Sequence, residues 1–179
     1  MVVMVIIAMM AAVTVPRLTG TREKQFRQTI DEIADLMTMY AQRDALSPKP
    51  IGIFHDLEDR VLSLVTLELI DPLNSTSAEW RVDAHVTPVA IPDFIKPDNI
   101  MAYEDGQPVG ITQIPMMNTP GKTRTAITVV VAYDDYNVEL YLPPHAVSPI
   151  VTGLYDNEDF VNPRESEDLD DLGRSREDW

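Results

Sequence analysis

An uninterrupted apolar run, Met1–Val15, most limits what this chain can fold into. Fourteen of its fifteen residues are apolar, Thr14 is the exception, and no charged residue occurs before Arg17. A helix rises about 1.5 Å per residue, so the run reaches about 22 Å, which is short of the roughly 30 Å hydrocarbon core of a bilayer. As printed, the run is too short to be a comfortable membrane span.

Such a run has three other possible interpretations. A cleaved secretory signal needs a basic region before the apolar stretch and a small-x-small site after it, but nothing basic precedes Val2 and the run leaves through Val15-Pro16-Arg17. A buried core helix stays open, because about 10–14 apolar residues often form one. A buried strand is disfavoured, since strands rarely reach this length.

Residues Val2–Leu18, VVMVIIAMMAAVTVPRL, resemble the N-terminal helix of type IV pilins and type II secretion pseudopilins. In that family a basic leader is removed before a Phe-Thr-Leu-x-Glu stretch, which continues into an apolar segment and then a proline or a charge. The printed sequence begins inside this pattern, so we expect a truncated start or a misplaced start codon. About seven further residues would bring the run past the roughly 20 needed to span a bilayer.

The resemblance implies a single-pass protein of the bacterial inner membrane, with its globular body in the periplasm. It implies contacts with other pseudopilins or pilins through the N-terminal helix, and action of the prepilin peptidase and N-terminal methylation on the full-length precursor. Pro16 is expected to break the helix after the anchor. The residues assigned to the membrane anchor and filament core are Val2, Val3, Val5, Ile6, Ile7, Ala8, Ala11, Ala12, Val13 and Val15.

Charge and composition restrict the possible partners. The 179 residues carry 29 acidic and 14 basic side chains, for a net charge of −15, and this surface repels phosphate. Nucleic acid is therefore not expected as a partner. The chain has no cysteine, which removes disulfides, thiolate metal sites and cysteine nucleophiles.

An amphipathic helix is predicted after the anchor. Apolar residues recur there at spacings of 4, 3, 4 and 3, which places them on one helical face. Ser47-Pro48-Lys49-Pro50 ends this helix, because neither proline can donate its hydrogen bond. The side chains expected to form the helix–sheet core are Phe26, Ile30, Ile33, Met37 and Tyr40.

The chain beyond Pro50 is predicted to be β-structure. Alternation over residues 80–87 is typical of a half-buried strand, and Asp105-Gly106 is a strong hairpin signal between strands over 100–103 and 108–114. Further strands are expected over 51–55, 60–70, 126–133 and 137–142. Short connections favour about six or seven mostly antiparallel strands.

The predicted fold class is therefore α+β: a long N-terminal helix, half anchor and half amphipathic, packed on a mostly antiparallel sheet. Four segments follow, namely an anchor over 1–18, an amphipathic helix over 19–47, a β-rich body over 48–155 and an acidic, mobile tail over 156–179. The order of elements resembles the pilin fold, and among its members the GspH-like minor pseudopilins.

No catalytic, cofactor-binding or metal-binding residue is expected. His55, His85 and His145 are far apart in the sequence and lack metal-ligand spacing. The acidic stretch 168–173 departs from a calcium loop at two ligand positions, although binding of calcium or of a partner by the tail stays open. The resemblance implies a structural subunit that acts in protein secretion or in a pilus-like filament by assembly; the alternative is a soluble α+β binding module with residues 1–15 as its core helix.

Overall fold

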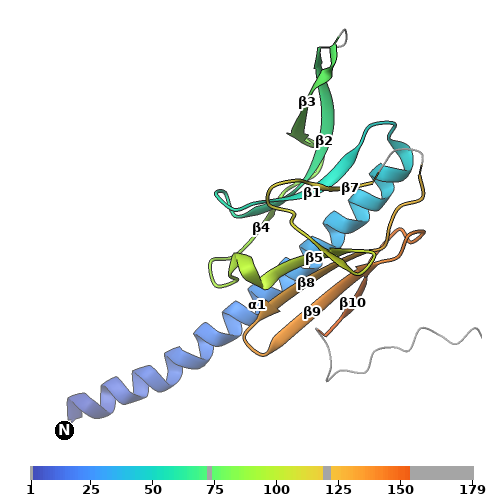
Figure 1. Cartoon of the computed structure of the whole chain (residues 1–179). Helices are drawn as coiled ribbons and strands as arrows, with labels where there is room; N and C mark the ends of the chain where they lie inside the picture. Colours follow the sequence, from blue (N-terminus) through green and yellow to red (C-terminus); the bar gives the residue numbers. More distant parts are fainter. Residues whose placement is uncertain (1, 72–73, 119–121, 154–179) are drawn as a thin grey trace, which may run out of the picture.

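In the part of the chain that the structure describes, the protein is α+β, with one α-helix and antiparallel sheets (Figure 1). The structure is a computed structural model, and it describes the backbone of residues 2–71, 74–118 and 122–153 and the side chains within these ranges except those of 2–20, 71 and 74–77. In these ranges ten strands form two five-stranded sheets, and every strand pair is antiparallel. The acidic tail predicted over 156–179 lies outside the described residues.

The helix, α1, runs from Val2 to Leu46 and stops directly before Ser47-Pro48, where the sequence predicts its end. It is continuous at Pro16, in place of the break expected there. A proline inside a helix removes one hydrogen bond and crowds the preceding turn, which helices accommodate by bending when the residues on both sides favour helix. Among the described residues, no helix is long and apolar enough to cross a membrane.

The first sheet follows the helix directly. Its strands are β1 (Ile51–Asp56), β2 (Val61–Asp71), β3 (Asn74–Val82), β4 (Val89–Ala90) and β7 (Met116–Met117). The order is β3-β2-β1-β7, and β4 pairs with the first residues of β2. Because β1 stops pairing at Thr66, the rest of β2 and its partner β3 continue alone as a two-stranded ribbon that projects from the body (Figure 1).

The second sheet has the order β10-β9-β8-β5-β6. After a 3₁₀ turn (η1, Pro97–Asn99) come β5 (Ile100–Glu104), β6 (Gln107–Val109), β8 (Ile127–Tyr133), β9 (Tyr136–Leu142) and β10 (Ile150–Thr152). Between β5 and β6, Asp105 and Gly106 both have positive φ, 48° and 76°. Positive φ at both central residues is the signature of the type I′ hairpin turn that Asp-Gly favours.

The core lies where both sheets close over the second half of α1. The stripe residues Phe26, Ile30, Ile33, Met37 and Tyr40 each have 0% exposure. Facing them are Ile53, Leu62 and Leu64 of the first sheet and Val129, Val131, Val138, Leu140 and Leu142 of the second, all at most 1% exposed. Both sheets therefore pack against the same face of the helix, and together they form one core.

Two expectations about the sheets need correction. A single sheet was expected under the helix, but the strands divide into two, which share α1 as their common surface. The half-buried strand expected over 80–87 was also wrong, because β3 ends at Val82, and Val82 and Ala84 are exposed. The alternation is real, but residues 80–84 lie at the base of the projecting ribbon and its exit, where they are exposed or half-buried, and of the alternating apolar residues Val86 alone joins the core.

Candidate functional site

The described part of α1 leaves the sheets through an aromatic cluster. The ring of Phe26 lies 5.4 Å from that of Tyr133 and 5.8 Å from that of Tyr136, and Phe94 lies 4.7 Å from Tyr133, measured between ring centroids. Tilted aromatic pairs at these distances add about 0.5–1.5 kcal/mol to simple area burial. Residues 21–25 are exposed or half-buried and Phe26 is fully buried, so this cluster closes the core at the end from which the N-terminal half of α1 extends past the sheets (Figure 1).

The predicted anchor occupies that N-terminal half. Its residues, from Val2 to Val15, have a helical backbone, but their side chains lie outside the described residues. Their assignment as membrane anchor and filament core therefore stays a prediction. The five stripe residues, in contrast, are brought together in the core as given above.

The C-terminal end of α1 is held by a buried polar cluster. Asn118 donates from Nδ2 to Asp44 Oδ2 at 3.3 Å and to the Lys122 carbonyl at 3.2 Å. Arg124, 8% exposed, donates to the carbonyls of Pro143, at 2.8 Å, and Ala146. The Asn118 bond attaches the helix end to the segment before β8, and the Arg124 bonds attach that segment to the loop after β9.

Tyr40 adds an unsatisfied group to this cluster. Its ring is fully buried, and among the described residues its hydroxyl has no hydrogen-bond partner of acceptable geometry, although the backbone of Asn118 lies near it. Burial, followed by the nearby Asp44 carboxylate, raises the pKa of the Tyr40 phenol well above its usual value of 10.0. The phenol is therefore held neutral, which makes it unsuited to act as a base.

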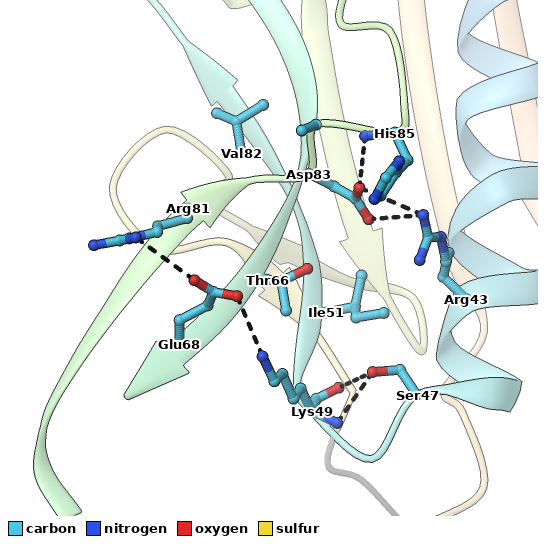
Figure 2. A pocket seen from close by; sticks show the side chains of 11 residues that line it. Arg43, Ser47, Lys49, Ile51, Thr66, Glu68, Arg81, Val82, Asp83 and His85 are labelled. Carbon is cyan, nitrogen blue, oxygen red and sulfur yellow. Dashed lines mark hydrogen bonds and ion pairs between the residues drawn. The ribbon is translucent and has the colours of Figure 1, made fainter. Parts of the chain in front are cut away.

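A polar cleft opens beside the same helix end, between α1 and the first sheet (Figure 2). Its charged groups come from three different parts of the chain. Arg43 of α1 pairs with Asp83 at 3.4 Å, and Lys49, between α1 and β1, pairs with Glu68 of β2 at 3.2 Å. Arg81 of β3 lies 3.7 Å from the same Glu68 carboxylate.

The backbone around the cleft is fixed by short-range turns. The His85 backbone N–H donates to Asp83 Oδ1 at 2.9 Å, and the Lys49 N–H donates to Ser47 Oγ at 3.1 Å (Figure 2). Such side-chain acceptors compete with regular secondary structure and favour turns. They end β3 after Val82 and shape the link from α1 to β1.

The chemistry of this cleft is that of a charged surface. Each carboxylate in it faces a cation, and the cleft contains no cysteine and no nucleophile–base pair. A nucleophilic site would need a hydroxyl or thiol within hydrogen-bond reach of a base. Within the described residues, no group of three or more His, Asp or Glu side chains is placed to hold a metal ion.

The three histidines do not come together. His85 borders the cleft and is exposed, as is His145, whereas His55 is 2% exposed on β1. Burial and the neighbouring Arg60 guanidinium lower the pKa of His55 below its usual value of 6.5, and Asp56 opposes that shift. His55 is thus a neutral core histidine, and its lowered pKa makes the stability of the fold depend on pH.

The sequence did not point to the cleft or to the projecting ribbon. We name this ribbon the β2–β3 arm, residues 67–71 and 74–82. Residues 67–71 and 74–80 lie beyond the last pair between β1 and β2, and Arg81 and Val82 form the base of the arm opposite Thr66 and Val65. One face of the arm carries Leu67, Leu69 and Trp80, and the other carries Glu68, Glu79 and Arg81. The available signal is the alternation that begins at Trp80, but over residues 80–87 it predicts a half-buried strand and not a projecting ribbon.

Comparison of the chain with protein-family models, with curated proteins and with solved structures gives no match.

Proposed function

We propose that this chain is a structural subunit of a filament of the type II secretion or type IV pilus-like class, similar to a minor pseudopilin, and that it acts by assembly. The observation that supports this proposal is the division of α1 into two halves. From Phe26 onward one face of the helix is sealed beneath two sheets, while the half that precedes Thr21 extends past them and is almost wholly apolar in sequence.

An apolar helix outside its own domain needs an apolar environment from elsewhere. Lipid chains and neighbouring apolar helices provide similar surroundings, so transfer between a membrane and a helical bundle costs little free energy. Residues Val2–Val15 would thereby hold the subunit in the inner membrane and then pack in the filament core. The β-rich body would lie in the periplasm, where its net negative charge favours solubility.

The first experiment removes residues 1–20 and measures unfolding by circular dichroism. The proposal expects a soluble protein that melts cooperatively, because the core formed around the Phe26–Tyr40 stripe is left intact. The alternative function, a soluble binding module with residues 1–15 as its core helix, expects loss of folding. Buried apolar side chains contribute about 1.5–3 kcal/mol each, so loss of that helix would exceed the stability of a whole domain.

A second experiment tests the membrane and assembly roles. The full chain, with a leader of the family type added before Met1, should stay with the membrane after alkaline washing, and a phosphatase fused after residue 153 should be active in the periplasm. Cysteines introduced singly at Val5 or Ala12 should cross-link neighbouring copies, since the chain contains no other thiol. An inactive fusion, or release from the membrane by alkali, would contradict the proposed location.

A further inference from the structure

We propose that β3 pairs with β3 of a second copy of this chain, antiparallel and about a twofold axis at Trp80. The strand is suited to this pairing because β3 is an edge strand of the first sheet, and among the described residues only β2 pairs with it. The arm stands away from the body, so its outer edge is open to another chain (Figure 1). An unpaired strand edge presents a row of N–H and C=O groups that a further strand can bind.

The direction of these backbone groups follows from the pairing with β2. The Asp83 N–H donates to the Leu64 carbonyl at 2.8 Å, in the same register that joins β3 to β2. Because hydrogen-bonding direction alternates along a strand, the N–H and C=O groups of Ala78, Trp80 and Val82 point to the free edge. In the proposed pairing, Trp80 would bond Trp80 of the second copy, and Ala78 would bond Val82.

The sequence of this stretch is self-complementary. It is Ala78-Glu79-Trp80-Arg81-Val82, which has a small or branched apolar residue at each end, opposite charges inside and the tryptophan at its centre. An antiparallel pair centred on Trp80 places Glu79 of each copy opposite Arg81 of the other. It also places Ala78 opposite Val82, so that no charged residue faces an apolar one. Oppositely charged and apolar cross-strand pairs of this kind stabilise a sheet.

The faces of the arm match the same arrangement. The register aligns Leu67 with Trp80 and Leu69 with Ala78, so these side chains share one face. Leu69 and Val82 are each 56% exposed, which leaves apolar surface uncovered in the single chain. Joining two arms at their β3 edges would continue this apolar face across four strands and bring the two Trp80 rings together.

Charge favours contact at this place in particular. Two copies with net charge −15 repel each other over most of their surfaces. On the polar face of the arm, Glu68 and Glu79 are balanced by Arg81 and by Lys49, which pairs with Glu68, so this group of four has no net charge. Around Trp80 the arm, with Lys49 beside it, thus offers a surface of balanced, alternating charges that a second copy can approach with little local repulsion.

This pairing goes beyond the proposed filament function and does not depend on it. It would join a membrane-anchored subunit and a soluble module equally well. The substitutions that test this pairing therefore lie in the arm of the full chain, and the N-terminal segment is left unchanged.

The first test is disulfide cross-linking of the full chain in detergent solution. The variant Trp80→Cys has its only thiol on the proposed axis, where the two Cα atoms would lie about 5.5 Å apart, within the Cα–Cα range of about 4.4–6.8 Å that disulfides span. Copper phenanthroline should convert it to a covalent dimer, at a rate about tenfold or more above that of the control Ile114→Cys, whose position is 67% exposed but lies off the arm. Equal rates for the two variants would overturn the proposal.

The second test exchanges charges in the Trp80→Cys background. Adding Glu79→Arg places two arginines opposite each other at both ends of the pair, and adding Arg81→Glu places two carboxylates there. Each should slow cross-linking about tenfold, because two favourable cross-strand pairs become unfavourable. The chain with both exchanges, and an equal mixture of the two single-exchange chains, should recover the original rate, since opposite charges then face each other again.

The remaining outcomes also support or contradict the β3 pairing. Cross-linking that does not respond to these exchanges would mean contact in another register or through the N-terminal segment, which contradicts the proposal. Circular dichroism melts should be the same for all variants, because the arm lies outside the core. If a charge-exchange variant melts at a lower temperature than the parent, an equal mixture of the Glu79→Gln and Arg81→Gln chains, both in the Trp80→Cys background, is used in its place. This mixture should cross-link more slowly than the parent, but by a smaller factor than the charge-exchange variants. A rate that stays at the parent value in that test would overturn the pairing.

Discussion

Glu68 and Glu79 face each other directly across the β2–β3 pair, and Arg81 lies within ion-pair distance of both, at 3.7 Å and 3.6 Å. Two like charges at opposite positions of an antiparallel pair destabilise it. Here Arg81 and Lys49 compensate the carboxylates from the same face. The arm is therefore held together on its polar side by charge balance.

Removal of Arg81 should loosen the arm and leave the body unchanged. Arg81→Ala leaves the two carboxylates facing each other with Lys49 as the remaining cation. Amide hydrogen exchange in β2 and β3 beyond Thr66 should become several-fold faster, while the global unfolding free energy changes by less than about 1 kcal/mol, as expected for exposed ion pairs. Adding Glu79→Gln should restore the slower exchange, and unchanged exchange in Arg81→Ala would contradict this role.

Tyr40→Phe should keep or raise stability. The hydroxyl is buried without a partner, so its removal deletes an unsatisfied polar group and keeps the ring that fills the core. We expect the unfolding free energy to rise by up to about 1 kcal/mol in urea denaturation. Tyr40→Leu is the matched control and should be destabilising through lost packing. A loss above about 1 kcal/mol in Tyr40→Phe would mean that the hydroxyl is bonded after all.

His55 should make the fold less stable in mild acid. Because the pKa of His55 is lowered in the folded state, the unfolded chain binds more protons between that pKa and 6.5, and protonation favours unfolding. The contribution of His55 is fully present above pH 6.5 and is lost as the pH falls through the folded-state pKa.

The melting temperature measured from pH 7.5 to 5 tests this effect. His55→Gln should reduce its decline with acid, although the variant starts lower because a buried group is replaced. His145→Gln changes an exposed histidine and should follow the parent curve. Parallel curves for the parent and His55→Gln would exclude His55 as the source of the pH dependence.

Ile33→Asp should unfold the domain. The side chain has 0% exposure between the helix and the sheets, so the variant buries a carboxylate with no partner provided for it. The cost of several kcal/mol is comparable with the total stability of about 5–15 kcal/mol of an ordinary domain. Gln25→Asp, at an exposed position of the same helix, should melt within a few degrees of the parent. A cooperative, parent-like melt for Ile33→Asp would contradict the assignment of this face to the core.

The helix face could be predicted from sequence because it depends on local periodicity. The spacing of Phe26, Ile30, Ile33, Met37 and Tyr40 has one interpretation at 3.6 residues per turn, and the two prolines beyond Ser47 mark the end of the helix. The hairpins β5–β6 and β8–β9 are likewise local. Asp-Gly sets the first turn, and alternation of Val138, Leu140 and Leu142 sets the buried face of β9.

The division into two sheets could not be predicted in the same way. Strands β4, β7 and β10 have two or three residues, and each forms only because a longer strand beside it provides an edge. The arm could not be predicted because alternation shows that a strand has two unlike faces, and does not show whether another layer covers one of them. The cleft combines the end of α1 with β2 and β3, and no local pattern connects these segments.

The stripe on α1 also determines the order in which the protein can be completed during synthesis. Phe26 leaves the ribosome long before Tyr133 and Tyr136, the residues whose rings cover it. Since chains are made from the N-terminus and fold by units as these emerge, the part of the helix face around Phe26 must stay uncovered until β8 and β9 are translated. A nascent chain halted before β8 would therefore expose the apolar helix face around Phe26 without the strands that cover it, which is the type of surface that chaperones bind.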